Sequence, residues 1–374
     1  MNTDLKVVVG LSGGVDSAVV ASLLVQAGYR VEGVTMRTWR EEGETEKRWQ
    51  DRSCCKIGIA QYVSQQLGIP HRVIEAEARF RAAVIDDFCQ TYAAGRTPNP
   101  CVLCNERVKF ALLLDAAEET GADCLATGHY ARVERDDETG RYRLLKGVDP
   151  VKDQSYFLYR LSQSQLARTL FPLGGLTKAE VWNKAEAMGL PVDDIAESQE
   201  ICFVTQKDYR DFVAAYVPGT ERPGAMVGAG GEALGSHRGV AFYTVGQRRG
   251  LGVAAGERRY VTKLDAERNL VVLGGEADLY ADACLVEDVH LVSVGSIAAP
   301  IRVAAKYRYK TPETPATVSP ASDGGLRVAF DEPQRAVTPG QSIVFYDGEL
   351  VVGGGIIART EESRCARAVT RQSG

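Results

Sequence analysis

Long apolar runs are the clearest thing missing from this sequence of 374 residues. The stretch from Leu5 to Leu11 is typical of the longest ones, and Lys6 interrupts it far short of the length that crosses a bilayer. No basic segment followed by an apolar one precedes it, so we expect no secretory signal. The sequence therefore predicts no membrane-spanning helix and a cytoplasmic location.

Repeats, low-complexity tracts and a strong excess of one charge are missing as well. Hydrophobic residues make up 45% of the chain and charged residues 25%, which excludes collagen-like and disordered classes. The net charge of -5 argues against a uniformly basic nucleic-acid binder, although local patches can differ from the average. The length predicts two or three domains.

Cysteine is present in an odd number, and its distribution is informative. Nine cysteines spread over a long chain do not resemble a disulfide framework, so reactive thiols or metal ligands are the better interpretation. They are Cys54, Cys55, Cys89, Cys101, Cys104, Cys124, Cys202, Cys284 and Cys365. The adjacent pair at 54 and 55 is poorly placed to chelate one ion, and those at 89, 124, 284 and 365 are expected to be packing or surface residues.

The first half alternates strand and helix patterns. Residues 5–10 and 31–36 read as strands on either side of a helix over 14–28. The alternation continues with a helix near 54–67, a strand near 71–74, two helices between 80 and 120, and a strand at 124–127. This order predicts an α/β fold with a parallel sheet covered by helices on both faces. Ligands of such sheets bind where the strands end, here after Val9, Val34 and Ala126.

Later segments change character. A hairpin is expected over 132–145, helices over 163–169 and 177–188, and an all-β pattern after about 215. We therefore predict a parallel-sheet domain over residues 1–214, a small β domain over 215–280, a β-barrel over 281–362 and a solvated tail over 363–374.

The first predicted strand runs directly into a loop rich in glycine and serine, which leads into a helix. Glycines let the backbone approach a ligand, hydroxyls donate hydrogen bonds, and a helix start favours an anion. The loop has neither the lysine of a Walker A motif nor the glycine spacing of a dinucleotide site. A turn without ligand is the alternative to a phosphate cradle. The loop residues are Gly10, Leu11, Ser12, Gly13, Gly14, Val15, Asp16 and Ser17.

This loop resembles the SGGxDS motif of the N-type ATP pyrophosphatases. The resemblance implies that ATP is split between its α and β phosphates, with AMP transferred to a carbonyl oxygen. It implies that the loop holds the pyrophosphate and that Asp16 helps to place Mg²⁺. Met36 and Gly128 follow strand ends that suit the adenine and ribose of ATP, although core packing explains Met36 nearly as well.

Two cysteine-containing segments follow, GRTPNPCVLCNERVKF from Gly95 and SQEICF at 198–203. The prolines around Asn99 predict a rigid, non-helical turn that presents Cys101 and Cys104 before a helix opened by Asn105. A thiol just before a helix start is expected to be partly thiolate.

With the ATP loop, these segments resemble the tRNA-specific 2-thiouridylase family of bacteria and mitochondria. The resemblance extends along nearly the whole chain through TGHYAR at 127–132, KDQSYFLY at 152–159, TVGQRRGLG at 244–252, RYK at 308–310, TPGQSIVFY at 338–346 and GGGII at 353–357. It implies that C2 of the wobble uridine U34 in the tRNAs for Lys, Glu and Gln is adenylated and then thiolated. Cys104 matches the nucleophile of the family and Cys202 its persulfide carrier, which a cysteine desulfurase or sulfur-relay protein would load.

One position departs from the pattern of the family. Many members have Asp three residues before the nucleophile, whereas this chain has Cys101. Cys101, Cys104 and Cys202 together could hold a [4Fe–4S] cluster whose open iron binds sulfide. Persulfide chemistry without iron is the alternative, and both remain open at this point.

The resemblance also implies RNA contacts. Those near the flipped base are Asn99, Pro100 and Cys101; those near the anticodon loop are His129, Lys152, Asp153 and Gln154; those from the last domain are Arg308, Tyr309 and Gln341. His129 could instead be a packed histidine. Residues 238–263 contain six basic residues and one acidic residue, and 302–310 contain basic residues with Tyr307 and Tyr309 as stacking candidates.

Two other functions compete with this interpretation. An ATP pyrophosphatase-type synthetase acting on a small metabolite would share the loop but has no use for Cys101, Cys104 and Cys202 together or for basic β domains. An RNA-binding module could use ATP only structurally. Formation of 2-thiouridine with release of AMP separates the three functions.

Overall fold

The computed structural model describes residues 4–40, 56–189, 201–204, 208–253, 258–322 and 324–362. Cys54, Cys55, Cys365 and the expected tail over 363–374 lie outside these ranges, so those predictions stay as they are. No helix in the described ranges has the length and apolar character to cross a membrane.

A parallel sheet forms the first part of the molecule, as the alternating pattern predicts. Its strand order is β3-β2-β1-β4-β7, and every pair is parallel. The strands are β1 (Lys6–Gly10), β2 (Arg30–Arg37), β3 (His71–Glu75), β4 (Cys124–Ala126) and β7 (Thr169–Leu170). The ends of β1, β2 and β4 therefore meet at one edge, where ligands of such sheets bind.

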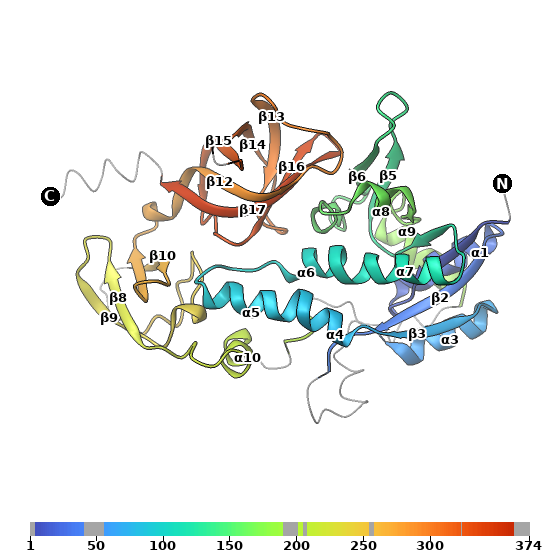
Figure 1. Ribbon diagram of the computed structural model, residues 1–374, viewed down its shortest axis with the longest axis horizontal. Helices are drawn as coiled ribbons and strands as arrows, with labels where there is room; N and C mark the ends of the chain where they lie inside the picture. Colours follow the sequence, from blue (N-terminus) through green and yellow to red (C-terminus); the bar gives the residue numbers. More distant parts are fainter. Residues whose placement is uncertain are drawn as a thin grey trace.

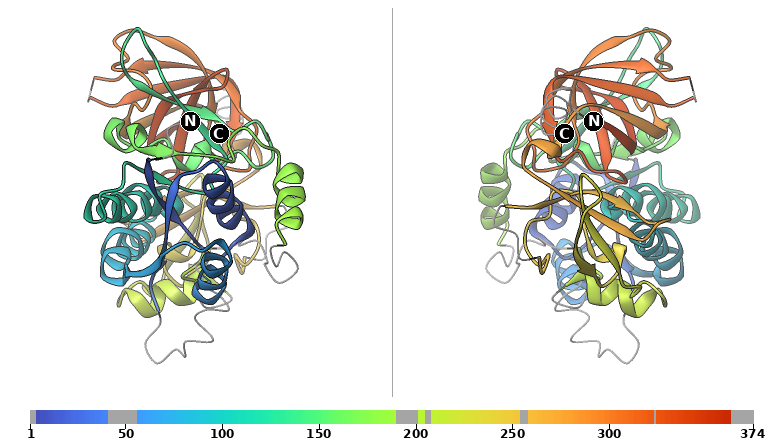
Figure 2. Two further views of the ribbon diagram at one scale, coloured as in Figure 1. Left: turned by 90° about the vertical axis from the view of Figure 1, so that its right-hand side faces the viewer. Right: turned by 90° about the vertical axis from the view of Figure 1, so that its left-hand side faces the viewer.

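Helices cover both faces of this sheet (Figure 2). Val7 and Val9 of β1 belong to the core beneath α1 (Val15–Gln26), α3 (Ile57–Leu67) and α9 (Lys178–Ala187). Val8 belongs to the core on the opposite face, beneath α7 (Phe110–Glu119). Alternate residues of a strand point to opposite faces, so β1 is buried on both.

Two long helical rods lie between the parallel sheet and the small β domain (Figure 1). The first consists of α4 (Glu77–Phe80), a π-helical segment η1 (Arg81–Ile85) and α5 (Asp86–Ala93). The second consists of α6 (Pro100–Leu103), a π-helical segment η2 (Cys104–Lys109) and α7. The two π-helical segments touch each other. Such segments occur frequently at functional sites.

The small β domain follows α10 (Tyr209–Tyr216) and has the strand order β10-β11-β8-β9. Its strands are β8 (Gly224–Gly228), β9 (Ala233–His237), β10 (Tyr260–Asp265) and β11 (Leu270–Gly274). Short 3-10 turns and the small helix α8 (Gln163–Ala167) complete the connections; the turns are η3 (Ser155–Phe157), η4 (Val240–Phe242) and η5 (Ala277–Leu279).

A closed β-barrel forms the last part. The order β12-β15-β14-β13-β16-β17 is closed by pairing of β12 with β17. Its strands are β12 (Tyr280–His290), β13 (Ile301–Lys306), β14 (Thr314–Pro320), β15 (Leu326–Arg335), β16 (Ser342–Asp347) and β17 (Leu350–Glu362). The expected hairpin, β5 (Ala131–Arg135) and β6 (Tyr142–Lys146), joins this sheet where Leu145 pairs with Leu350. The first and last parts of the chain thus share one sheet.

Candidate active site

The glycine-serine loop leaves the end of β1 and is held in shape by its own hydroxyls. Ser17 Oγ donates to the Gly14 carbonyl at 2.9 Å and accepts from the Ser12 amide at 3.2 Å. Ser12 Oγ accepts from the Gly14 amide at 3.3 Å. The loop then becomes α1 with Gly14 at the position before the helix. The open amides of the helix start suit an anion.

Gly13 is required at its place in this loop. Its φ is +77°, and a Cβ there would lie 2.4 Å from the carbonyl oxygen of Lys56. The Lys56 amide in turn donates to the Ser12 carbonyl at 2.6 Å. Lys56, the residue before α3, therefore packs against the loop and leaves no room for a side chain at position 13.

Asp16 is the charged residue of the loop, and two distant side chains hold it. Tyr130 Oη and Lys178 Nζ each donate to Asp16 Oδ1 at 2.8 Å. Sequence reasoning missed Lys178, because it lies 162 residues from Asp16 and belongs to none of the quoted motifs. A lysine directly after the capping residue Thr177 was the only available signal.

Met36 and Gly128 lie at the sheet edge, as their sequence positions predict. Met36 is buried in the core on the α7 face of the sheet. A Cβ on Gly128 would lie 3.2 Å from Cβ of Asp16, so this backbone passes close to the start of α1. Their contacts with adenine and ribose remain predictions.

The turn before the cysteine pair differs from the expectation. The helix begins at Pro100 with Asn99 before it, so Cys101 and Cys104 lie inside the helical rod rather than in a non-helical turn ahead of Asn105. The prediction was wrong because proline is favoured at the first position of a helix, where it lacks only an amide that has no helical partner. Cys104 begins the π-helical segment η2.

Residues of the barrel hold the turn that precedes this helix. Gln341 Nε2 donates to the carbonyls of Pro98 at 2.7 Å and Thr97 at 3.2 Å, and the Thr97 amide donates to the Pro339 carbonyl at 2.9 Å. Gly340 has a φ of +93°, and a Cβ there would lie 2.7 Å from the Thr97 oxygen. Asn99 Nδ2 donates to Tyr156 Oη at 3.3 Å.

Burial distinguishes the cysteines. Cys101 is exposed, Cys202 is half-buried and Cys104 is buried at 8% exposure. Cys89 and Cys284 are buried packing residues, as expected, and burial raises the pKa of each to about 12. Within the described ranges, no three Cys, His, Asp or Glu side chains are grouped as a metal site requires. A cluster on Cys101, Cys104 and Cys202 therefore stays a prediction.

Glu106 and Asn105 follow Cys104 and fix its segment to the rest of the molecule. Arg160, only 6% exposed, donates through Nε to Glu106 at 2.6 Å and through Nη1 to Asp288 of the barrel at 2.8 Å. Asn105 Nδ2 donates to the Phe157 carbonyl at 3.2 Å, and its buried Oδ1 has no hydrogen-bond partner in the described structure. The buried guanidinium of Arg160 therefore joins this region to the barrel.

His129 lies at the sheet edge beside Phe110 and Phe171, with ring centroids 5.7 and 6.3 Å away. Its Nδ1 shares a hydrogen bond with Thr127 Oγ1 at 2.8 Å. Burial lowers the pKa of His129 to about 3, and the charge of Lys109 acts in the same direction. The packed, neutral ring suits the alternative that sequence reasoning left open for it.

The segment Lys152-Asp153-Gln154 makes internal hydrogen bonds. The carboxylate of Asp153 accepts from the Gly147 amide at 3.0 Å and the Ser155 amide at 3.1 Å. Gln154 Oε1 accepts from the Tyr130 amide at 3.0 Å. Asp153 and Gln154 thus order this loop, and RNA contact from the segment remains a prediction.

A cavity of about 360 Å³ opens where the first part, the small β domain and the barrel meet. Arg308 donates there to the Ala336 carbonyl at 2.6 Å and to Thr338 Oγ1 at 2.7 Å. Burial lowers the pKa of Arg308, and the charge of Arg335 acts in the same direction. The cavity is lined by Thr97, Tyr209, Arg210, Thr244, Val245, Gly246, Gln247, Arg308, Arg335, Thr338 and Gln341.

The basic stretches are less free than their sequence indicates. Arg302 pairs with Asp331, and Arg238 pairs with Glu221 at 2.7 Å. Tyr307 is 6% exposed in the barrel core, so its prediction as a stacking surface was wrong: alternation along the strand turns it inward. Tyr309 is half-buried, with its ring centroid 4.4 Å from that of Phe157.

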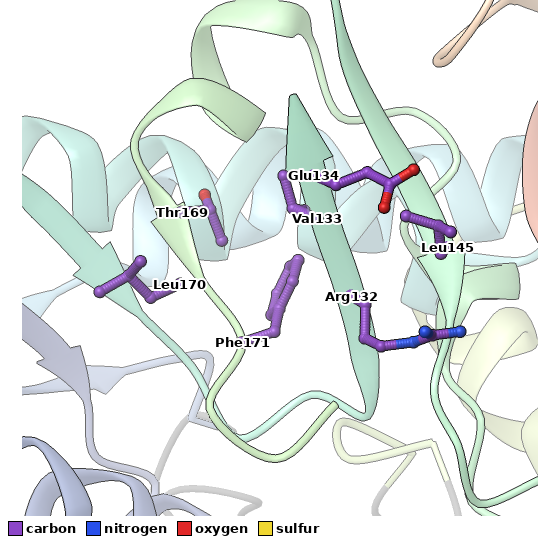
Figure 3. A pocket seen from close by; sticks show the side chains of 7 residues that line it. All are labelled: Arg132, Val133, Glu134, Leu145, Thr169, Leu170 and Phe171. Carbon is purple, nitrogen blue, oxygen red and sulfur yellow. The ribbon is translucent and has the colours of Figure 1, made fainter. Parts of the chain in front are cut away.

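A second hollow of about 270 Å³ lies between the hairpin and β7 (Figure 3). Arg132, Val133 and Glu134 of β5 face Thr169, Leu170 and Phe171 across it, with Leu145 beside them. None of the predicted ligand-binding residues lines this hollow. Phe171, which lines this hollow, also packs against the ring of His129.

The fold and the loop place the first part of the chain in a class of nucleotide-binding domains. A family model described as "tRNA methyl transferase HUP domain" matches residues 5–206. The models described as "tRNA methyl transferase PRC-barrel domain" and "Aminomethyltransferase beta-barrel domain" match residues 210–275 and 281–357.

Curated relatives extend this similarity over almost the whole chain. The tRNA-specific 2-thiouridylase MnmA of Pelotomaculum thermopropionicum is 47% identical over 95% of this chain and 98% of its own length. That of Moorella thermoacetica is 48% identical over 93% and 98%. The chain belongs to the tRNA-specific 2-thiouridylase family.

Solved structures give a more distant similarity. The U34-tRNA thiolase NcsA from Methanococcus maripaludis with its [4Fe-4S] cluster is 20% identical, with a TM-score of 0.32, over 58% of this chain and 66% of that one. The NMN synthetase from Francisella tularensis is 18% identical, with a TM-score of 0.30, over 51% and 65%.

Proposed function

We propose that this protein forms 2-thiouridine in tRNA, using ATP to activate the base and cysteine-bound sulfur to replace its oxygen. The observation that carries the proposal is identity of 47% over 95% of the chain to a named tRNA-specific 2-thiouridylase. In this scheme residues 1–214 carry the chemistry, and residues 215–280 and 281–362 help to hold the RNA. The site of action is U34 of the tRNAs for Lys, Glu and Gln, in the cytoplasm.

Activation comes first. The C2 oxygen of the uridine attacks the α-phosphorus of ATP, the bond to pyrophosphate breaks, and the base becomes a C2–O–AMP adduct. The departing pyrophosphate is assigned to the loop from Gly10 to Ser17, where the start of α1 favours an anion. AMP then makes a good leaving group of an oxygen that is otherwise a poor one.

Sulfur transfer comes second. The outer sulfur of a persulfide on Cys202 attacks C2, and AMP leaves with the electron pair of its C–O bond. Cys104 then attacks the inner sulfur, which leaves C2=S on the base and a disulfide between Cys104 and Cys202. A thiol reductant supplies the two electrons that reset the pair, and a desulfurase or relay protein reloads Cys202. Alternatively, Cys104 releases hydrosulfide from Cys202, and this species attacks C2.

Mg²⁺ and a [4Fe–4S] cluster are the two candidate cofactors besides ATP. Both donors to Asp16 use Oδ1, so among the described side chains Oδ2 is available for Mg²⁺, which would offset phosphate charge. Within the described ranges no grouping of Cys101, Cys104 and Cys202 supports a [4Fe–4S] cluster, and the steps above use only thiol and persulfide chemistry.

RNA binding is supported by the interdomain cavity. Arg210, Arg308 and Arg335 line this cavity. Thr97 also lines it and belongs to the turn that leads to α6, the helix that contains Cys101. Guanidinium groups are suited to binding the phosphates of an anticodon loop. The unstacked bases of such a loop can be flipped out at a low cost in free energy. His129, Lys152, Asp153, Gln154, Tyr309 and Gln341 are the further contacts that we propose by family resemblance.

The test is mass spectrometry of tRNA after incubation with the protein, ATP, Mg²⁺ and a sulfur source. Formation of 2-thiouridine at position 34, with one AMP released per thiolated base, supports the proposal. AMP release without RNA would favour a small-metabolite synthetase instead. ATP binding without any AMP release would favour an RNA-binding module.

A further inference from the structure

An ion pair links α9 to the ATP loop. Lys178 Nζ lies 2.8 Å from Asp16 Oδ1, and the two side chains are 12% and 33% exposed. The position of Lys178 is fixed because α9 begins with a full capping box between Thr177 and Glu180. In addition, the Lys178 amide donates to Asp149 Oδ2 at 2.9 Å.

Two aromatic rings lie beside the ammonium group of Lys178. Lys178 Nζ lies 5.1 Å from the ring centroid of Trp182 and 6.0 Å from that of Tyr130. The Tyr130 hydroxyl binds the same carboxylate oxygen as the ammonium does. These contacts restrict the lysine on several sides, and a restricted cation is suited to a defined ligand position.

A partly buried ion pair contributes little stability by itself, because desolvation offsets much of the attraction. The surroundings point to another role. Asp16 lies in the first turn of α1, within the glycine-serine loop that we propose as the site of the pyrophosphate. The loop residues Ser12, Gly14 and Ser17 are neutral, whereas pyrophosphate carries several negative charges.

We propose that Lys178 binds the pyrophosphate end of ATP, with Asp16 and Tyr130 holding its ammonium group beside the loop. This inference rests on the proposed function, because it names the side chain that neutralises the leaving group in the adenylation step. The charge on Lys178 also cancels that of Asp16, which would otherwise repel the phosphates. Binding to pyrophosphate strengthens as the bond to the α-phosphorus breaks, so the contact favours the transition state.

The experiment compares Lys178→Met with Lys178→Arg and with Lys184→Met, a matched substitution on the same helix. Inorganic pyrophosphate and AMP serve as separate inhibitors of adenylation. Lys178→Met is expected to raise the inhibition constant of pyrophosphate roughly 10- to 100-fold while changing that of AMP less than about 3-fold. Lys178→Arg keeps most of the pyrophosphate affinity, and Lys184→Met leaves both constants unchanged.

Equal weakening of AMP and pyrophosphate by Lys178→Met, or no weakening of either, would overturn the inference. Thermal unfolding shows whether each variant is folded, and Lys178→Gln replaces the Met variant if that one does not fold. Direct calorimetric titration of pyrophosphate into the whole protein needs no thiolation activity. A failure of the proposed RNA chemistry therefore remains distinguishable from a failure of the lysine assignment.

Discussion

The side-chain amide of Gln341 donates to the carbonyl of Pro98 at 2.7 Å, across 243 residues of sequence. It thereby joins the barrel to the turn before α6, the helix that contains Cys101. Family resemblance predicts Gln341 as an RNA contact, and the two roles are compatible because both hydrogen bonds to the turn use its Nε2, whereas its Oε1 is a separate acceptor. We infer that Gln341 is a positioning residue for Cys101 and Cys104.

Replacing Gln341 by Leu should disturb that turn. Loss of two hydrogen bonds to backbone carbonyls is expected to lower kcat for thiolation roughly 10-fold with little change in KM for ATP. Steady-state kinetics with saturating tRNA measures the split. Gln334→Leu in β15 is the matched control, since the side chain of Gln334 accepts from Tyr307 Oη and donates to the Glu332 carbonyl rather than to the turn. A change in KM for ATP alone would contradict the positioning role.

Substitution of the cysteines separates the two sulfur mechanisms. On the persulfide route, Cys104→Ser and Cys202→Ser abolish thiolation, because each removes a sulfur that forms or accepts a bond. Cys101→Ala, at an exposed position, should keep activity within about 3-fold. Thiolation assays are run together with analysis of iron and acid-labile sulfide. Loss of both iron and activity in Cys101→Ala would establish a cluster instead.

Arg308 should contribute to RNA affinity, and Arg302 should not. Arg308 lines the interdomain cavity, whereas Arg302 is on the barrel surface and paired with Asp331. Arg308→Ala is expected to weaken tRNA binding and to reduce the slope of log affinity against log salt by about 1, since one phosphate contact is lost. Filter binding at several salt concentrations measures the slope. An equal effect of Arg302→Ala would show that only general charge matters.

His129 should make the stability of the protein depend on pH. Burial lowers its pKa in the folded state to about 3 from an ordinary value of 6.5, so the unfolded chain takes up the proton first. Stability is therefore full above about pH 6.5 and falls as the pH is lowered towards 3. Urea unfolding at pH 7 and pH 5 should show a smaller loss for His129→Asn than for the unchanged protein. The lowered pKa of His71 acts in the same direction in both proteins and cancels from the comparison.

Local patterns predicted β1, the glycine-serine loop and α1 because a short continuous apolar run, the glycines and the helical spacing all act within a few residues. The contacts of Asp16 with Lys178 and of Gln341 with Pro98 span 162 and 243 residues, and no local preference encodes them. Pro100 marks a different kind of failure. The same residue suits a turn and a first helical position, and only the packed helix decides between them.

The sheet shared by the hairpin and the barrel affects how the chain can be divided. β17 meets β6 at Leu350 and Leu145, so separating the first part from the last uncovers strand edges that are now paired. Exposed edges template association with other chains. If the first part were isolated, the edge of β6 would be open to association with other chains, and evolutionary exchange of the barrel for another domain would have to replace the hairpin as well.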